Sequence, residues 1–322
     1  MSKWYFNDDT SREGLMGSGR NSTYSGPLSF LRRKYTRNIE NADVVVSGIP
    51  FDCATTNRPG TRLGPRAIRE ASVQLADLPT FPYGFDLFEH LAIVDYGDCF
   101  IDHGYPGKVT ERVEAHADEI LSSQAKMLTL GGDHFVTYPL LRAHAKEYGP
   151  LSMLHFDAHL DTWCDDGKRI DHGSMFARTA EEGIVIPSQS VQVGIRSFNE
   201  KSYGYNVLDA PFVHEEGVKA TISEIKRIVG NNKVYVTFDI DCLDPSVAPG
   251  TGTPVVGGLT MVQALSIMRS LGDLNLIAMD VMEVAPAYDI SEITALAAAT
   301  LAFEFLCLMA IKNGAKSITP TP

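Results

Sequence analysis

Six side chains in three short motifs have the chemistry of metal ligands: His134, Asp157, His159, Asp161, Asp239 and Asp241. The motifs read GGDH at residues 131–134, DAHLD at 157–161 and DID at 239–241. In an extended segment, residues two apart point to the same face and lie about 6.6 Å from each other. We therefore expect the acids and the histidine of DAHLD to form one row and the two acids of DID to form another.

The four carboxylates of these motifs need compensating positive charge. No lysine or arginine stands within DAHLD or DID, and burying unpaired carboxylates costs several kcal/mol per ion, whereas two divalent cations would balance them. Carboxylate and imidazole ligands without thiolate suit Mn²⁺, Mg²⁺, Fe²⁺ or Zn²⁺, and the carboxylate majority favours Mn²⁺. Two such ions would hold a bridging solvent molecule and deliver it as hydroxide, so the predicted reaction is a hydrolysis. For either acidic motif taken alone, a solvated strand end or turn is the alternative.

Two further side chains have the chemistry to act on a substrate. Glu283, in the sequence MEVAP, could bind a planar cation such as guanidinium through both carboxylate oxygens, and an acid at the start of a helix is the alternative. His172, in the sequence DHGSMF, has an ordinary pKa of about 6.5 and could give a proton to a departing amine, although loop histidines are often only solvated. His155 and Asp133 are better placed to support the ligands than to bind metal.

The elements that must position these motifs alternate along the chain, with short apolar runs separated by segments of helical period. We predict strands over residues 44–49, 91–95, 127–130, 151–157, 190–195, 234–239 and 276–280. We predict helices over residues 110–125, 137–147, 218–229, 260–271 and 291–311. This alternation is typical of a doubly wound, mostly parallel α/β sheet, in which ligands bind beyond the carboxyl ends of the strands. GGDH, DAHLD, DID and Glu283 each follow a predicted strand, so we expect them to share one rim of the sheet.

Composition limits the classes of protein and partner. The 322 residues are 44% hydrophobic and 21% charged, which is typical of a globular chain, and no linker divides them, so one doubly wound domain is expected. The 28 basic and 40 acidic residues give a net charge of −12. This charge disfavours nucleic acid and anionic membranes as partners and suits a small cationic substrate, although an acidic excess also serves solubility alone.

Cysteine usage and apolar segments bear on the compartment. The five cysteines are widely spaced without a CxxC motif, which indicates a reducing compartment. The first residues show no apolar segment of a secretory signal, and the longest uncharged stretch, 293–303, is too short to span a bilayer. We therefore expect a soluble cytoplasmic protein.

Taken together, these motifs resemble those of the ureohydrolases, the family of arginases and agmatinases. GGDH, DAHLD, FDIDCLDP at 238–245, PGTGTP at 249–254 and MEVAP occur in the order of that family, and the resemblance covers about residues 43–311. DHGSMF and EITALAAATLA at 292–302 resemble the bacterial agmatinases most, although these usually carry threonine where Ser174 stands.

The resemblance implies a fold and an assembly. The expected fold is a three-layer α/β/α domain with a mainly parallel eight-stranded sheet, formed by residues 41–322. Residues 1–40 have no clear counterpart and are expected to form an irregular arm. Members of the family usually assemble as trimers or hexamers, so a homo-oligomer is expected.

The resemblance also implies residue roles. It places one Mn²⁺ between His134, Asp157, Asp161 and Asp239, and a second between Asp157, His159, Asp239 and Asp241, so each subunit would hold two Mn²⁺ ions bridged by Asp157 and Asp239. It further implies that Glu283 binds the guanidinium group, that His172 shuttles a proton and that Thr253 lies near the substrate.

The substrate tail is less determined. Arginases carry, after DAHxD, Asn and Ser residues that recognise the amino-acid carboxylate, whereas this chain reads TWCDDGKRIDH, which disfavours arginine. Asp165, Asp166 and Asp171 would suit the terminal ammonium of agmatine, and Lys168 and Arg169 keep 4-guanidinobutyrate open. We expect hydrolysis of agmatine to urea and putrescine by a metal-bridging hydroxide. The same chemistry on another guanidino acid is the main alternative, followed by an arginase or a non-catalytic metal-binding scaffold.

Overall fold

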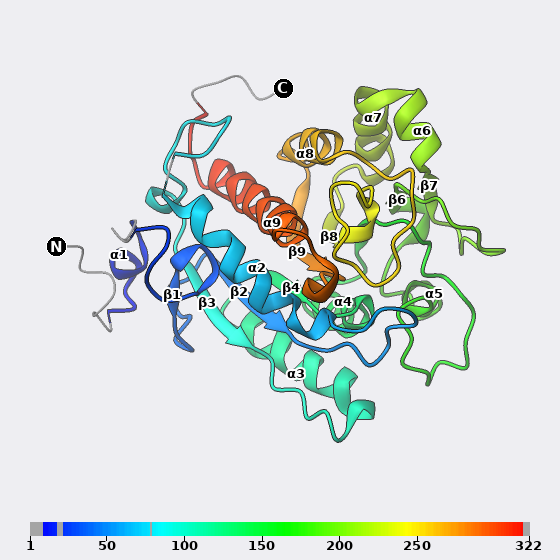
Figure 1. The fold of residues 1–322 in the computed structure, drawn as a ribbon, viewed down its shortest axis with the longest axis horizontal. Helices are drawn as coiled ribbons and strands as arrows, with labels where there is room; N and C mark the ends of the chain where they lie inside the picture. Colours follow the sequence, from blue (N-terminus) through cyan, green and yellow to red (C-terminus); the bar gives the residue numbers. More distant parts are fainter. Residues whose placement is uncertain (1–8, 18–21, 78, 318–322) are drawn as a thin grey trace.

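The computed structural model describes residues 9–17, 22–77 and 79–317, which form a nine-stranded sheet whose paired strands are all parallel (Figure 1). In spatial order the strands are β1 (Lys34–Tyr35), β3 (Ile93–Asp98), β2 (Val44–Ile49), β4 (Lys126–Gly131), β9 (Asn275–Met282), β8 (Lys233–Asp239), β5 (Ser152–Phe156), β6 (Val191–Val193) and β7 (Asn206–Leu208). Parallel strands need crossovers, and helices supply most of them, whereas β6 and β7 are joined by a loop.

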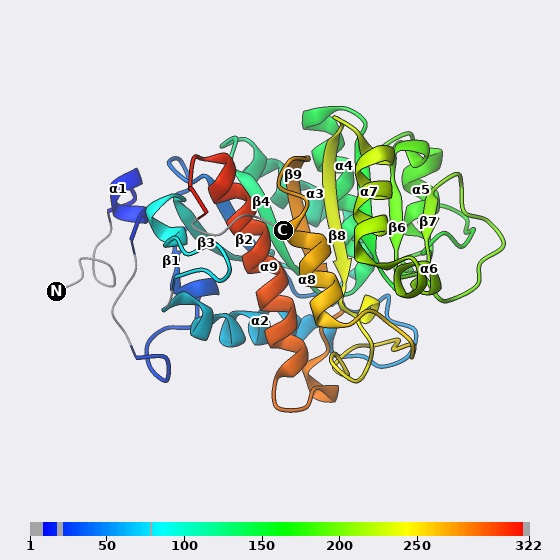
Figure 2. The ribbon, with the colours of Figure 1, turned by 90° about the horizontal axis from the view of Figure 1, so that it is seen from above.

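Helices cover both faces of the sheet, which makes three layers. One face packs against α2 (Gly64–Ser72), α6 (Ala210–Glu215), α7 (Gly217–Val229), α8 (Met261–Arg269) and α9 (Ile293–Lys312). The other face packs against α3 (Val109–Leu121), α4 (Thr137–Tyr148) and α5 (Met175–Glu181). In Figure 2, α7, α8 and α9 lie in front of the strands. The predicted three-layer α/β/α class is confirmed.

Side chains along each strand alternate between the two core layers. In β8, Val234 and Val236 pack into the layer beneath α7–α9, whereas Tyr235 packs into the layer beneath α3–α5. Because both faces are covered, the strand reads as an apolar run instead of an alternating one. This burial is why seven of the nine strands, β2 to β6, β8 and β9, were recognisable from the sequence.

The sheet has one strand more than the resemblance implied, and the shortest elements were missed. β1 has only two residues, and β7 is an edge strand of three residues of which only Leu208 is buried, so neither shows a hydrophobic pattern. The helices α2, α5 and α6 have at most nine residues and were also not predicted. β1 and the short helix α1 (Arg12–Leu15) belong to the expected arm of residues 1–40, so the described part of that arm is not wholly irregular. The domain boundary after residue 40 stays a prediction.

The four strands that precede the chemical motifs are neighbours in the middle of the sheet, in the order β4, β9, β8 and β5. Leu130 pairs with Val281, Val281 pairs with Phe238, and Phe238 pairs with Phe156. The residues that follow these four therefore leave the sheet at one level. The prediction that the motifs share one rim is confirmed.

Helix α9 is the one candidate membrane span among the described residues. The helix has 20 residues, and its most apolar window has a mean hydropathy of 2.0, so by length and composition alone it could cross a membrane, although the uncharged stretch 293–303 within it is shorter. The composition has another cause, because 83% of its most apolar window is buried within the fold. Glu304, inside this helix, is also buried and forms an ion pair with Arg269 and a hydrogen bond from Tyr83.

Replacing Arg269 by alanine is expected to destabilise the fold by about 3 kcal/mol, because it leaves the Glu304 carboxylate buried without its cation. The matched control is Arg227→Ala, which removes an exposed ion pair with Glu224 and should leave the free energy of unfolding nearly unchanged. Chemical denaturation measures both free energies of unfolding. Equal losses in the two variants would contradict the importance of the buried pair.

Candidate metal centre

Three carboxylates converge on one nitrogen of a buried histidine. The Nδ1 atom of His134 lies 3.1 Å from Asp157 Oδ2, 3.3 Å from Asp161 Oδ2 and 3.2 Å from Asp239 Oδ2. All four residues are buried. They come from the ends of three different strands, β4, β5 and β8, so the sheet brings together residues that are far apart in the sequence.

A second group of ligand atoms adjoins the first. His159 Nδ1 lies 3.2 Å from Asp157 Oδ1 and 3.2 Å from Asp241 Oδ2. Asp157 therefore offers one oxygen to each group. Burial lowers the pKa of His159, but the charges of Asp241 and Asp157 outweigh it and raise that pKa to about 12. Both groups thus attract positive charge.

The ligands converge through turns and not through the extended rows expected from the sequence, so that expectation was wrong. The backbone N–H of His159 donates to Asp157 Oδ1 at 2.6 Å, and Asp161 has a positive φ of 52°. At the other motif, the N–H of Asp241 donates to Asp239 Oδ1 at 2.8 Å and begins a 3-10 turn. Each first aspartate thereby folds its own segment as well as facing the centre.

The hydrogen bonds behind His134 assign its protons. Asp280, which is fully buried, accepts hydrogen bonds from the hydroxyls of Thr137, Tyr235 and Thr237. Because the only hydroxyl proton of Thr237 is used on Asp280, its oxygen accepts from His134 Nε2, at 2.8 Å. In the neutral ring Nδ1 is then the unprotonated nitrogen, and it points at the carboxylates.

This arrangement fits a metal ion. His134 Nδ1 is buried and has no hydrogen-bond partner among the described residues. A lone pair facing three carboxylate oxygens is repulsive unless a cation lies between them. Burial lowers the pKa of His134, but Asp157, Asp161 and Asp239 raise it well above its ordinary value, so the position takes up a proton when no metal is bound.

His155 supports a ligand and is not set up to be one. Gln192 Nε2 donates to the carbonyl of Leu160 at 2.7 Å, which fixes the amide orientation, and to His155 Nδ1 at 2.9 Å. The other ring nitrogen of His155 therefore carries the proton and donates to Asp157 Oδ2 at 2.7 Å. Asp133, also expected to have a supporting role, accepts from the backbone N–H of Ala54 at 2.9 Å.

Glu283 has one satisfied and one unsatisfied oxygen. Its Oε1 accepts from the backbone N–H of His134 at 2.8 Å and from His172 Nδ1 at 2.9 Å. Its Oε2 is buried and has no hydrogen-bond partner among the described residues. A Cβ atom on Gly252 would lie 3.3 Å from Oε2, so the glycine keeps the space beside this oxygen open. An acceptor of this kind is left for a donor outside the protein chain.

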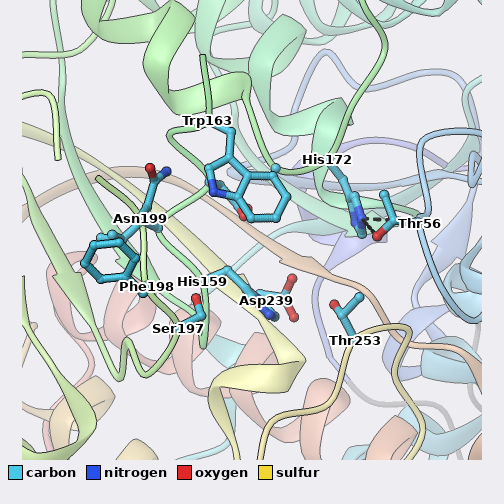
Figure 3. A pocket seen from close by; sticks show the side chains of 12 residues that line it. Thr56, His159, Trp163, His172, Ser197, Phe198, Asn199, Asp239 and Thr253 are labelled. Atoms are coloured by element: carbon cyan, nitrogen blue, oxygen red, sulfur yellow. Dashed lines mark hydrogen bonds between the residues drawn. The ribbon is translucent and has the colours of Figure 1, made fainter. Parts of the chain in front are cut away.

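His172 lies between Glu283 and Thr56. Its Nε2 is 2.8 Å from the Thr56 hydroxyl and 3.2 Å from the Thr56 backbone N, contacts that Figure 3 shows as dashed lines. The hydroxyl can accept from a protonated ring and the N–H can donate to a neutral one, so Thr56 satisfies both states. Burial lowers the pKa of His172, but Glu283, Asp161 and Asp133 raise it to about 9.

A cavity of about 80 Å³ opens over the two ligand groups (Figure 3). Its lining residues are Thr56, His159, Leu160, Asp161, Trp163, His172, Gly173, Ser197, Phe198, Asn199, Asp239 and Thr253. Thr253, expected near the substrate, lines the cavity and donates to Asp241 Oδ2 at 3.2 Å. Asp171, also expected to contact substrate, is absent from this lining and pairs with Arg169 at 2.9 Å.

Seven lining residues were not among the predicted site residues: Leu160 and Gly173 within the recognised motifs, and Thr56, Trp163, Ser197, Phe198 and Asn199 outside them. The five outside the motifs stand in loops without periodicity. Trp163 follows the ligand Asp161 by two positions, which is the one local signal that could have indicated it.

Comparison with known proteins agrees with this geometry. Residues 42–308 match the arginase family. An agmatinase of Chromobacterium violaceum is 60% identical over 309 residues, covering 95% of this chain and 96% of the relative. An agmatinase of Escherichia coli O7:K1 is 51% identical over 297 residues, covering 91% and 97%. A crystal structure of a hypothetical agmatinase from Burkholderia thailandensis has a TM-score of 0.92 at 57% identity, covering 93% and 95%.

The chain belongs to the arginase family. Together with that membership, the buried groups around His134 and His159 indicate a site for two metal ions.

Replacing Thr237 by valine is expected to weaken metal binding roughly 10- to 100-fold, because it removes the acceptor that orients His134. The control is Thr129→Val, an isosteric change at a buried threonine whose hydroxyl has no hydrogen-bond partner among the described residues. Competition with a chelator measures metal affinity without relying on activity. Unchanged affinity in Thr237→Val, or an equal loss in both variants, would contradict the orienting role.

Proposed function

We propose that this protein is an agmatinase, which hydrolyses agmatine to urea and putrescine. The observation that carries the proposal is the buried, unpaired Oε2 of Glu283 beside the His/Asp cluster, because it offers a carboxylate to a guanidinium group next to a metal site. Relatives that are agmatinases at 51% and 60% identity over most of the chain support the choice of substrate.

We propose two Mn²⁺ ions per subunit. His134, Asp157, Asp161 and Asp239 would hold one, and Asp157, His159, Asp239 and Asp241 the other. The two oxygens of Asp157, each facing a different histidine, support its bridging role. The bridging role of Asp239 rests on the family resemblance. When bound, such ions supply hydroxide at neutral pH by lowering the pKa of water.

Glu283 would bind and orient the guanidinium group. Its Oε2 accepts from a guanidinium N–H in the space that Gly252 leaves open. Its Oε1 remains hydrogen-bonded to the backbone N–H of His134. The carboxylate that would bind the substrate therefore also positions a proposed metal ligand. A charged hydrogen bond of this kind fixes direction as well as position.

His172 would give its proton to the departing amine. A pKa raised to about 9 keeps the ring protonated at neutral pH, as a proton donor requires. His172 lines the cavity, and Thr56 can satisfy the ring after the proton has left. The amine is then released in a neutral form and not as a poor amide leaving group.

The lining favours a cationic tail over a carboxylate tail. Lys168 and Arg169, which kept 4-guanidinobutyrate open, do not line the cavity, and the twelve lining residues include no lysine or arginine. A carboxylate tail would therefore lack a cation to pair with, and the net charge of −12 also attracts a cationic substrate. This makes agmatine the preferred guanidino substrate.

We further propose that residues 41–322 form one catalytic domain and that the enzyme works in the cytoplasm as a homo-oligomer, a trimer or hexamer as the family resemblance implies. Small molecules, and neither nucleic acid nor membrane, are its proposed partners.

The direct test is urea release from agmatine, arginine, 4-guanidinobutyrate and 3-guanidinopropionate, measured with Mn²⁺ and after chelation. We expect turnover of agmatine that chelation abolishes and Mn²⁺ restores. Turnover of another guanidino compound in place of agmatine would overturn the substrate and keep the reaction class. Release of urea from none of them would favour a non-catalytic metal-binding scaffold.

Replacing His172 by alanine is expected to lower kcat for agmatine by roughly 10²- to 10⁴-fold, because the leaving amine loses its proton donor. Metal content should stay at the wild-type value, since His172 is not among the proposed ligands. His103→Ala, at an exposed loop histidine outside the cavity, is the control and should leave both quantities unchanged. A parallel loss of metal and activity in His172→Ala would argue for a structural role.

A further inference from the structure

The acids expected to bind the substrate tail are engaged elsewhere. Asp165 pairs with Arg178, and both side chains are largely buried. Asp166 is exposed and accepts from the backbone N–H groups of Lys168 and Arg169. Asp171 pairs with Arg169 as described above. None of the three lines the cavity, so a terminal ammonium must be recognised by other groups.

Two exposed aromatic rings stand at the opening of the cavity instead. Trp163 is 55% exposed and Phe198 is 85% exposed, and both line the cavity. In Figure 3, Trp163 lies above His159 and Asp239, with Phe198 to one side of the opening. Single exposed apolar residues are ordinary, but two large aromatic rings at one opening provide a surface for a ligand.

The backbone attaches both rings to the metal-ligand segments. The N–H of Trp163 donates to the carbonyl of Gly173 at 2.9 Å, directly after His172. A Cβ on Gly173 would lie 3.1 Å from Trp163 Cε3, so the indole packs closely on this glycine. Residues 158 and 197 are joined because the Ser197 N–H and hydroxyl both donate to the carbonyl of Ala158, at 3.1 and 3.0 Å. The backbone beside each ring is thus tied to the metal-ligand segments, and the Trp163 indole also packs on Gly173.

The loops that carry the two rings are also bonded to each other. Asn199 Nδ2 donates to Thr162 Oγ1 at 3.0 Å, and the Thr162 hydroxyl donates to the carbonyl of Lys201 at 2.7 Å. The Asn199 amide is therefore used within the protein. The only carboxylates among the lining residues are Asp161 and Asp239, which are proposed metal ligands. No other lining carboxylate is present to bind the terminal ammonium of the substrate.

We propose that Trp163 and Phe198 determine substrate specificity by binding the terminal ammonium of the substrate through their aromatic faces. This inference rests on the proposed function and names the groups that read the tail. Aromatic faces carry negative charge density, so they attract an ammonium by cation–π interaction and disfavour a carboxylate. The two rings thereby distinguish agmatine from 4-guanidinobutyrate without a charged side chain.

The experiment compares substrates that differ only at the tail. Butylguanidine has the same four-carbon chain as agmatine without the ammonium, so the ratio of kcat/KM for agmatine and butylguanidine isolates recognition of the charge. In Trp163→Leu this ratio is expected to fall roughly 2- to 30-fold, mainly through a higher KM for agmatine, with kcat nearly unchanged. Trp163→Phe should keep part of the selectivity, and Phe198→Leu should lower it in the same direction.

The control is Phe100→Leu, at a phenylalanine that is 76% exposed and does not line the cavity, and it should leave the ratio unchanged. Thermal unfolding and light scattering show whether each variant keeps its fold and its oligomeric state. An unchanged ratio of kcat/KM in Trp163→Leu overturns the proposal. It is also overturned if the ratio in Trp163→Phe is as low as the ratio in Trp163→Leu. If Phe198→Leu changes the oligomeric state and leaves the ratio unchanged, Phe198 belongs to a subunit interface. The proposed role of Phe198 in substrate recognition is then wrong.

Failure of the proposed function gives a different result. If the wild-type protein releases urea from neither agmatine nor butylguanidine, the reaction itself is wrong. If it releases urea from both at similar kcat/KM, the reaction stands and recognition of the ammonium is wrong.

Discussion

Mutual repulsion between four carboxylates is the constraint that the centre of this structure must satisfy. Asp157, Asp161, Asp239 and Asp241 lie in a buried site, and the ion-pair partners of these acids in the described part of the chain are histidines. Histidine compensates a carboxylate only when it is protonated, so charge balance requires either bound protons or bound metal. The hydrogen bonds from Asp280 through Thr237 place a proton on His134 Nε2, so in the neutral ring the lone pair of Nδ1 faces the acids and is available to a metal ion.

The same carboxylates also build the backbone that carries them. Asp157 folds the turn at His159, and Asp239 folds the turn at Asp241. Glu283 likewise bonds to the backbone of His134 while keeping one oxygen for a substrate. Structure and chemistry therefore share atoms in this site, so a substitution of one of these acids changes the geometry of its segment as well as its charge.

The sequence predicted a site residue well where its position depends only on one strand and the motif that follows it. The strand β8 and the DID motif after it are contiguous, so both the strand and the position of its acids could be predicted. The turns could not, because Asp161 and Glu283 have positive φ angles, which the hydrophobic pattern does not indicate. Asp165 shows the same limit, since only the fold reveals that Arg178 neutralises it. Trp163 and Phe198 both line the opening of the cavity. They lie in loops, which have no hydrophobic period from which their positions could be predicted.

The order of strands in the sheet has a consequence for how the protein is made. β8 and β9 are the last strands of the chain, yet they fill the middle of the sheet between β4 and β5. A nascent polypeptide that has left the ribosome only as far as β7 holds two separate half-sheets whose inner edges are open. The site shared by β4, β5, β8 and β9 therefore cannot be complete until the last two strands have been synthesised, and until then the inner edges of β4 and β5 have no partner strand.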